Sequence, residues 1–166
     1  MGTDKVKLVI GMITGNEALF EKTACILEKR FGAVDYESPA LKFDYTDYYD
    51  AELGRNLKRK FMCFKKLIEQ DDLAGIKVYT NNLEQRFLKK GNRSINLDPG
   101  YLSEAKLVLA TTKDYAHRIY LRKGIYAEVT LRFRNGSYRP WQWTYPDYRS
   151  AAYIRIFNEM RSKWKT

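Results

Sequence analysis

Residues 111–118 combine side chains that can bind phosphate with side chains that can move a proton. Lys113 and Arg118 are cations that pair well with phosphate oxygens. Asp114 and His117, the only histidine in the sequence, can exchange protons with a ligand. The segment follows an apolar run that we expect to be a buried strand, and loops at such places often carry functional residues. The alternative is a surface connection whose histidine packs into the core.

Residues 43–49, with the sequence FDYTDYY, contain two carboxylates and three tyrosines and show no hydrophobic period. Asp44 and Asp47 are three residues apart, so they would share one face of a helix and could bind Mg²⁺ through their oxygen atoms. Tyr45 and Tyr48 would then lie beside a ligand. The alternative is an ordered surface loop in which the tyrosines pack on the core and Asp47 caps a turn.

Residues 96–101, with the sequence NLDPGY, contain the turn-forming triplet DPG. Proline presets its own φ and glycine adopts positive φ easily, so we expect a tight turn here. A functional interpretation is a rigid loop that presents Asn96, Asp98 and Tyr101 to a ligand. The alternative is a plain turn with no further role.

Asn135-Gly136 lies between two alternating segments and predicts a hairpin, because a type I′ turn needs positive φ at both central positions. With this two-residue loop, Arg132 faces Arg139, and position 128 faces position 143. One face of the hairpin then carries Glu128, Thr130, Arg132, Arg134, Arg139, Trp141 and Trp143. The other face, which we expect to meet the core, carries Val129, Leu131, Phe133, Tyr138 and Pro140.

The pairing of Arg132 with Arg139 places like charges opposite each other, which is unfavourable when no ligand is present. An anion between them would relieve the repulsion, and the indoles of Trp141 and Trp143 could stack on nucleic-acid bases. The alternative is that the arginines cover the tryptophans through cation–π contacts and bind nothing. The sequence leaves both interpretations open.

The candidate segments support three functional hypotheses, none of which defines a cofactor. The first is an enzyme or nucleotide-binding protein with a polar cleft for a phosphate-containing ligand. Its candidate catalytic residues are Asp98, Lys113, Asp114 and His117. Its candidate ligand-binding residues are Asp44, Tyr45, Asp47, Tyr48, Asn96, Tyr101, Arg118 and Glu128, among which Asp44, Asp47 or Glu128 would hold any Mg²⁺. The second is a non-catalytic RNA- or DNA-binding module that uses Arg132, Arg134, Arg139, Trp141 and Trp143, and the third is a structural or assembly partner.

Several common sites are excluded by residue types and spacing. The sequence contains neither Gly-x-x-x-x-Gly-Lys-Ser/Thr nor Gly-x-Gly-x-x-Gly, which argues against a P-loop GTPase. A single histidine excludes His-rich metal sites and phosphoesterases with two catalytic histidines, and makes zinc improbable. Cys25 and Cys63 are too few for a disulfide framework, so we expect two reduced, buried, small apolar residues rather than a redox pair.

The net charge of +10 is unevenly distributed. Residues 1–54 carry a net charge of −4, residues 55–100 carry +6 and residues 101–166 carry +8. This distribution favours an anionic ligand, with nucleotides and nucleic acids as the leading classes, although a merely solvated basic surface would give the same values. No apolar run approaches the ~18 residues of a membrane span, and the first residues lack the features of a signal peptide. We therefore expect a cytoplasmic protein without membrane association.

Hydrophobic periodicity predicts one α+β domain over residues 1–166. We expect strands at 6–12, 33–36 and 61–68, a helix that Asn16 caps and that ends before Gly32, and a helix that Asp71 or Asp72 caps and that Gly91 ends. This βαββα order is compatible with a ferredoxin-like N-terminal part. A buried strand at 106–111, two C-terminal hairpins and a C-terminal helix starting near 144–146 complete a mixed, mostly antiparallel sheet. The hairpins turn at residues 122–124 and 135–136.

Several of these motifs together resemble a family of short bacterial and archaeal proteins classified only as a domain of unknown function. They are FDYTDYY at 43–49, Thr80-Asn81 with Leu83-Glu84, NLDPGY at 96–101, ATTKD at 110–114, HRIY at 117–120, YAE at 126–128 and WTYPDY at 143–148. The resemblance spans nearly the whole chain. Some members carry an automatic GTP-binding label, which gains no support here because the phosphate-cradling loop is missing.

Overall fold

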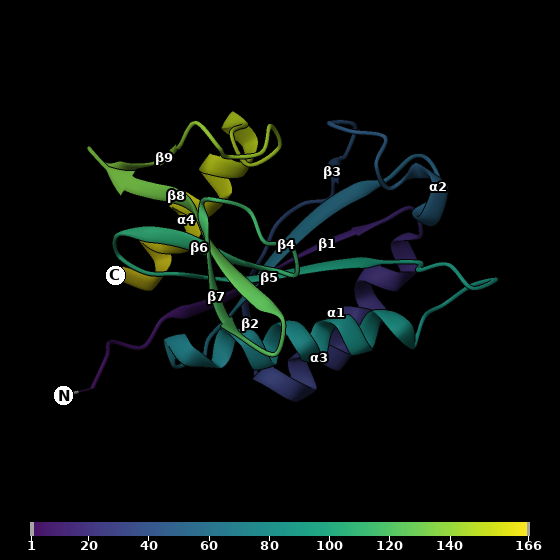
Figure 1. Ribbon diagram of the computed structural model, residues 1–166, viewed down its shortest axis with the longest axis horizontal. Coiled ribbons are helices and arrows are strands. Elements are labelled where there is room, and N and C mark those ends of the chain that lie inside the picture. The colour runs from purple at the N-terminus through teal and green to yellow at the C-terminus, as the bar shows by residue number, and fades with distance from the viewer. Residues whose placement is uncertain (1, 166) are drawn as a thin grey trace.

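The computed structural model describes residues 2–165 as an α+β fold built on one nine-stranded sheet (Figure 1). The strands are β1 (Lys7–Thr14), β2 (Val34–Glu37), β3 (Leu41–Lys42), β4 (Lys58–Phe64), β5 (Asn96–Leu102), β6 (Lys106–Thr111), β7 (Arg118–Arg122), β8 (Ile125–Arg134) and β9 (Ser137–Pro140). The helices are α1 (Glu17–Phe31), α2 (Asp50–Leu53), α3 (Leu73–Gln85, after a 3₁₀ turn at Gln70–Asp72) and α4 (Ala151–Lys165). The predicted fold class is confirmed.

The strands lie in the order β2-β4-β1-β5-β6-β8-β7, with β3 beside β4 and β9 beside β8. All of these pairings are antiparallel. The part β2-β4-β1-β5, with α1 and α3 in its connections, has the strand order of a ferredoxin-like fold. The predicted ferredoxin-like N-terminal part is therefore confirmed, and the later strands extend its sheet beyond β5.

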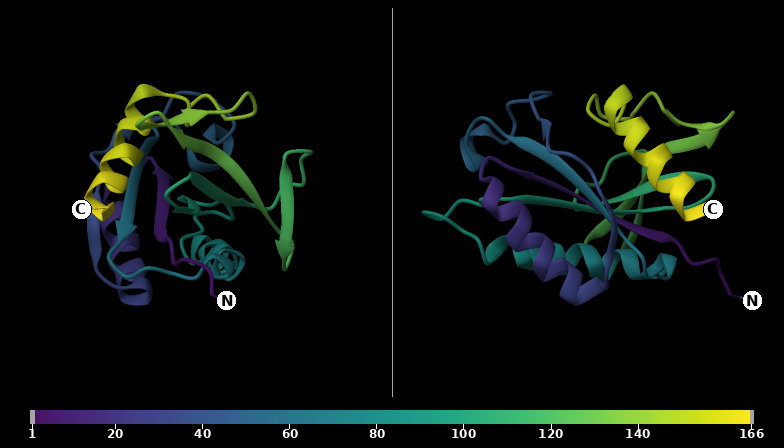
Figure 2. Two further views of the ribbon diagram at one scale, coloured as in Figure 1. Left: turned by 90° about the vertical axis from the view of Figure 1, so that its left-hand side faces the viewer. Right: turned by 180° about the vertical axis from the view of Figure 1, so that it is seen from behind.

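Different helices cover the two faces of the sheet (Figures 1 and 2). α1 and α3 cover one face and pack on Leu8 and Ile10 of β1. α4 covers the other face, where Tyr153 and Phe157 pack around Phe61 of β4. β1 is buried along its whole length, which explains why both of its faces carry apolar residues.

The predicted turn at Asp98-Pro99-Gly100 is wrong, because these residues lie inside strand β5. β5 pairs with β1 along its whole length, whereas its pairing with β6 begins only at Gly100, opposite Leu109. Pro99 has no N–H to donate, so a ladder between β5 and β6 cannot continue normally past it. β5 therefore has no hydrogen-bonded partner in β6 from Asn96 to Pro99. This leaves a gap between the two strands.

The C-terminal hairpin between β8 and β9 has the predicted turn, with φ of 51° at Asn135 and 79° at Gly136. Arg132 lies opposite Arg139, also as predicted. However, β9 ends at Pro140, so position 143 does not pair with position 128, and both tryptophans lie outside the ladder. The β7–β8 hairpin turns through two residues, Lys123 and Gly124 with φ of 55° and 76°, rather than through three.

The ends of α1 agree with the prediction, whereas the end of α3 does not. α1 begins after Asn16, whose Oδ1 accepts from the N–H of Ala18, and ends before Gly32 as predicted. α3 ends at Gln85 rather than at Gly91, because the chain turns at Lys89–Asn92 instead of continuing the helix. β4 runs from Lys58 to Phe64 and so starts and ends earlier than the predicted 61–68.

α4 begins at Ala151, later than the predicted 144–146. Ser150 precedes it, and its Oγ accepts from the N–H of Tyr153, as an N-cap side chain does. Thr144 is not a helix cap. Its Oγ1 accepts from the N–H of Trp141 at 2.9 Å and donates to the carbonyl of Thr130 at 2.6 Å. These bonds hold the segment before α4 against β8.

The two cysteines differ from each other. Cys63 is buried in the core, as expected, whereas Cys25 is exposed on α1, so the prediction of burial is wrong for Cys25. Cys25 lies off the apolar stripe of the helix, which runs through Phe20 and Leu27. Both thiols are free. Within residues 2–165, no helix is long and apolar enough to cross a membrane.

Candidate functional site

A cavity of about 540 Å³ lies where β5 and β6 are unpaired. Four stretches of the chain line it: the loop at 43–49, the unpaired part of β5, residues 109–113 at the end of β6, and residues 145–148 before α4. Further side chains reach it from β4, α3, β7 and β8. Its volume is within the range typical of small-molecule sites.

Arg59 of β4 lies at the floor of this cavity, with only 2% of its side chain exposed. Its Nη1 donates to Asp98 Oδ2 at 2.8 Å, and its Nη2 donates to Asp147 Oδ2 at 3.3 Å. Its Nε donates to the hydroxyl of Tyr153 at 3.2 Å. All three nitrogens thus have a partner, and one guanidinium joins β4, β5, α4 and the segment before α4.

The position of Arg59 follows from the alternation of β4. Phe61 and Cys63, at spacing i+2 and i+4, share its face of the strand and pack into the core under α4. On the neighbouring strand β1, Gly11 leaves room for the guanidinium. A Cβ there would lie 2.8 Å from Phe61 Cε1 and 2.9 Å from Arg59 Nη1, too close for any side chain without displacement.

The two carboxylates that share Arg59 have opposite pKa shifts. Burial alone would raise the pKa of Asp98, but the charges of Arg59 and Lys77 and hydrogen bonds from Arg59 and Asn96 outweigh it, and the pKa is lowered. Burial dominates at Asp147, where the opposing charge of Arg59 is insufficient, and the pKa is raised. Asp98 is therefore held as a carboxylate, and Asp147 takes up a proton more readily than an ordinary aspartate.

A second ion network supports the unpaired part of β5. Arg93 donates from Nε and Nη2 to the carboxylate of Glu52 in α2, at 2.9 and 2.7 Å. Its Nη1 lies 3.2 Å from Glu84 Oε1 in α3 and donates to Asn96 Oδ1 at 2.9 Å. Asn96 in turn donates from Nδ2 to Asp98 Oδ2 at 2.9 Å. These contacts connect α2 and α3 to the cavity floor.

Aromatic rings of the 43–49 loop form one wall of the cavity. The ring centroid of Phe43 lies 5.9 Å from those of both Tyr45 and Tyr49, and Tyr45 lies 6.0 Å from Tyr153 of α4. Burial raises the pKa of Tyr49 above its ordinary range, so its hydroxyl stays neutral. The loop therefore packs on the core, as the simpler interpretation expected, and also faces the cavity.

Lys113 and Tyr48 lie together at the mouth of the cavity. Lys113 Nζ is 3.5 Å from the Tyr48 hydroxyl and 4.7 Å from the centroid of its ring. Both residues are exposed. No carboxylate in the described part of the chain forms an ion pair with Lys113. Its ammonium group is thus available to an anion.

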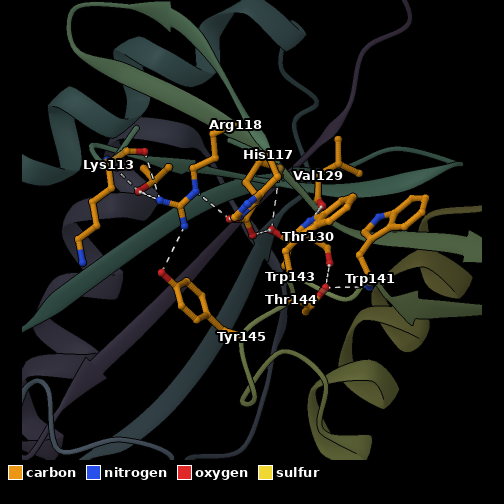
Figure 3. Close-up of polar contacts among 11 residues, drawn as sticks. Lys113, His117, Arg118, Val129, Thr130, Trp141, Trp143, Thr144 and Tyr145 are labelled. Carbon is orange, nitrogen blue, oxygen red and sulfur yellow. Dashed lines mark hydrogen bonds and ion pairs between the residues drawn. The ribbon is translucent and has the colours of Figure 1, made fainter. Parts of the chain in front are cut away.

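Arg118 is held firmly in the wall next to Lys113 (Figure 3). Its Nε donates to Glu128 Oε2 at 2.8 Å, and its Nη2 donates to the hydroxyl of Tyr145 at 3.3 Å. Its Nη1 donates to the backbone carbonyl of Lys113 at 3.2 Å. The last bond fixes the backbone of Lys113, so Arg118 positions that lysine at the mouth in addition to contributing its own charge.

His117 belongs to a stack of side chains beside this wall. Its Nε2 lies 3.0 Å from Glu128 Oε2, and its ring stacks on Trp143 with centroids 5.4 Å apart. Trp143 lies between His117 and Trp141 (Figure 3), and the two indoles are 5.0 Å apart. The guanidinium of Arg132 covers Trp141 at 4.4 Å.

The structure brings together most, but not all, of the predicted site residues. The cavity lining includes Tyr45, Tyr48, Asn96, Asp98, Lys113, Arg118 and Glu128. Tyr101 is elsewhere, in the core with Val108 and Ile125. Asp114 is exposed, and His117 reaches the site only through Glu128. Asp44 and Asp47 do not line this cavity but a second one of about 600 Å³, which residues 55–58 also line.

The predicted Arg/Trp face makes several contacts of its own, although Arg132 Nε and Trp141 Nε1 are buried without a hydrogen-bond partner in the described residues. Arg139 turns back to the hairpin, where its Nε donates to the carbonyl of Arg134 at 2.8 Å, and Arg132 turns to Trp141. The two like charges therefore point to different neighbours. Trp143 Nε1 donates to the carbonyl of Val129 at 2.9 Å. This geometry favours cation–π packing, and nucleic-acid binding by this face stays a prediction.

Several cavity residues were not predicted, notably Arg59, Lys77, Arg93, Asp147 and Tyr148. The sequence contained one indication that Arg59 is buried, because Arg59 alternates with Phe61 and Cys63 and so shares their face of the strand. A buried charged side chain must have a partner. Asp147 lies where the sequence predicts the first turn of the C-terminal helix, whereas α4 begins only at Ala151. For Lys77 the only sign was a lysine within the apolar stripe of α3.

The described residues offer no metal centre of the usual kind. No group of three or more His, Cys, Asp and Glu side chains within residues 2–165 could hold a metal ion. Glu128 is already bonded to Arg118, His117 and Thr130, whereas Asp44 pairs with Lys42 at 3.6 Å on the surface. The suggested Mg²⁺ ligands thus lie in different places.

Comparisons with known proteins give a family but no activity. Residues 4–164 match the family model described as "Domain of unknown function (DUF4416)". No curated protein and no solved structure matches the chain.

Proposed function

The chain belongs to the DUF4416 family, whose function is unknown, and from the geometry of its cavity we propose that it binds a small phosphorylated ligand such as a nucleotide. The observation that carries the proposal is the position of Lys113. It lies at the mouth of a cavity of about 540 Å³, held there by Arg118, with no carboxylate paired to it among residues 2–165. A phosphate at the mouth would give the ammonium group of Lys113 the anionic partner that it lacks among the described residues.

The composition of the wall supports a ligand with a ring in addition to a phosphate. Five tyrosines and Phe43 contribute to the lining, interspersed with polar groups such as Thr111 and Asn81. Flat aromatic side chains bury ring systems well, while a few placed polar groups give orientation. The lining also contains five basic and three acidic residues, which favours an anion.

The same geometry favours binding over proton transfer by the residues at 114–117. Asp114 is exposed to solvent. His117 does not line the cavity, and its ring contacts Glu128 and Trp143. Asp98 lines the cavity, but its carboxylate Oδ2 is bonded to Arg59 and Asn96. We therefore assign Lys113 and Arg118 to phosphate binding and assign no reaction to the protein.

A thermal-shift series tests the proposal with nucleoside mono- and triphosphates, ribose 5-phosphate, pyrophosphate and inorganic phosphate. A ligand that binds only the native state stabilises it by about 2.7 kcal/mol at a hundred times its Kd. Lys113→Met keeps the aliphatic stem and removes the charge, so it should weaken binding about tenfold. Lys66→Met is the matched control, because Lys66 is exposed and lies outside the cavity.

The proposal predicts a rise in the melting temperature with at least one phosphorylated compound, a smaller rise in Lys113→Met and an unchanged rise in Lys66→Met. If none of these compounds stabilises the protein, the proposal is wrong. Equal losses in the two variants would show that binding depends on general positive charge rather than on the cavity.

A further inference from the structure

Two polar groups lie at the inner end of the cavity, Lys77 of α3 and Tyr148 of the segment before α4. Both side chains line the cavity and both are more than nine-tenths buried, with 7% of Lys77 and 3% of Tyr148 exposed. Each retains hydrogen-bonding capacity that the described chain does not use.

Lys77 has an incomplete set of partners. Its Nζ donates one hydrogen bond, to the carbonyl of Leu97 at 3.2 Å, although an ammonium group has three donors. None of the ion pairs within residues 2–165 includes Lys77. A buried ammonium with unused donors is costly, so a further acceptor is expected at this position when the site is filled.

Tyr148 has no partner for its hydroxyl at all in the described part of the chain. Its ring is fixed, stacked on Phe157 with centroids 6.0 Å apart and set edge-on to Tyr153 at 5.5 Å. Burial raises the pKa of Tyr148 well above its ordinary value, so the hydroxyl keeps its proton and remains a donor. A buried, unsatisfied hydroxyl that lines a cavity is a second and independent sign of a missing acceptor.

Asp98 lines the same cavity as Lys77 and Tyr148, and the charge of Lys77 contributes to lowering its pKa. However, Asp98 Oδ2 already accepts from Arg59 and Asn96, and neither Lys77 nor Tyr148 donates to it. Lys77 and Tyr148 therefore offer three unused donors in the same cavity as Asp98, whose Oδ2 is already bonded.

We propose that Lys77 and Tyr148 form an inner subsite that binds an acceptor oxygen of the ligand, a carbonyl or carboxylate at the end opposite the phosphate. This rests on the proposed function, because it assumes a ligand whose phosphate lies at Lys113. The ligand class becomes a phosphorylated compound with acceptor oxygens at its far end, either an oxo-substituted base or a carboxylic acid. Asp98 and Arg59 position the subsite without donating to the ligand.

Two pairs of compounds test the subsite and separate the two sources of the oxygen. Inosine and adenosine 5′-monophosphate differ in whether the purine carries an oxo or an amino group. 3-Phosphoglycerate and glycerol 3-phosphate differ in the carboxylate. In at least one pair the compound with the acceptor oxygen should bind about tenfold more tightly by calorimetry, since one hydrogen bond to a charged donor supports a difference of this size.

Tyr148→Phe is the decisive variant, because it removes only a hydroxyl that has no partner in the free protein. Its melting temperature without ligand should equal or exceed that of the wild type, while the preference within the pair should fall severalfold. Lys77→Met should abolish the preference. Tyr101→Phe is the control, since Tyr101 is also buried but lies in the core outside the cavity, and it should retain the full preference.

Each outcome has a defined meaning. Lys113-dependent binding of all four compounds with equal affinity overturns the subsite and leaves the proposed function intact. A preference that survives in both Tyr148→Phe and Lys77→Met also overturns the subsite. If none of the four compounds binds, the subsite is wrong, and the proposed function is wrong as well if no compound of the thermal-shift series binds.

Discussion

The guanidinium of Arg59 on β4 reaches across β1 to the carboxylate of Asp98 on β5, with Nη1 and Oδ2 2.8 Å apart. The two strands are not neighbours, because β1 lies between them. The contact passes Gly11 of β1, where a Cβ would lie 2.9 Å from Arg59 Nη1. The floor of the cavity therefore depends on a glycine that carries no functional group.

Gly11→Ala should destabilise the protein. The added Cβ would lie 2.8 Å from Phe61 Cε1 and 2.9 Å from Arg59 Nη1, and both side chains are buried and tightly packed. Overpacking of this kind costs about 1–3 kcal/mol. Urea denaturation measures the change in the free energy of unfolding.

Gly75→Ala is the control, and it should change the free energy of unfolding in the opposite direction. Gly75 lies within α3, and a Cβ there would have its nearest neighbour, Arg122 Nη2, at 3.8 Å. Alanine should therefore stabilise the helix by up to about 1 kcal/mol. A Gly11→Ala protein as stable as the wild type would contradict the role assigned to this glycine.

Asp98→Asn should lower the free energy of unfolding by about 3 kcal/mol at neutral pH, because it leaves the buried Arg59 with only one charged partner. The folded-state pKa of Asp98 lies below its ordinary value of 3.8. The stabilisation from its ionised form is thus complete above 3.8 and is lost as the pH falls through the folded-state pKa. Denaturation curves below pH 4 should show wild type and variant converging.

Asp147→Asn should show the opposite dependence on pH. The folded-state pKa of Asp147 is raised above 3.8 by burial, so ionising it costs stability as the pH rises from 3.8 through the folded-state pKa. The stability of the wild type relative to Asp147→Asn should therefore decrease over that window. The same pH trend in both variants would mean that the two carboxylates do not differ in the way described.

Only one of the two thiols should react in the native protein. Cys25 is exposed, whereas Cys63 is buried, and burial together with its hydrogen bond to Asp35 raises the pKa of the Cys63 thiol. A thiol-reactive chromophore should label one cysteine quickly and the second only after unfolding. Because neither thiol is in a disulfide, reductant should leave the melting temperature unchanged. A drop of several degrees with reductant would contradict this.

Trp143→Phe should destabilise the protein by about 1–2 kcal/mol, because it removes the hydrogen bond to the carbonyl of Val129 and weakens the stack with His117. Trp164→Phe, near the end of α4, is the control and should cost less. Chemical denaturation measures both changes.

Trp141→Ala separates the two interpretations of the Arg/Trp face. If Trp141 only packs on Arg132 and Trp143, the substitution should lower stability and leave the affinity for a single-stranded oligonucleotide unchanged. If it stacks on bases, the affinity should fall by ~1–3 kcal/mol per base. Fluorescence anisotropy at about 50 mM salt, where phosphate contacts are strong, distinguishes the outcomes.

The sequence by itself determined the features whose causes lie within a few residues. Asn135-Gly136 turns where predicted because both residues adopt positive φ, and Asn16 caps α1 with its own side chain. The strand at 106–111 and the ferredoxin-like order followed from apolar periodicity and element order. Polar motifs in the sequence also identified seven residues that line the cavity, six in the segments 43–49, 96–101 and 111–118 and Glu128 on the hairpin.

Only the tertiary structure decided which of these residues meet and what lies beneath them. Asp98-Pro99-Gly100 has the local chemistry of a turn, yet pairing with β1 outweighs that preference and makes it a strand. Arg59 finds its partners 39 and 88 residues away, because strand order and the packing of α4 set those contacts. Local propensity is worth about 1 kcal/mol per residue or less, whereas a buried charge requires several, so the core determines where the charged side chains of the site must lie.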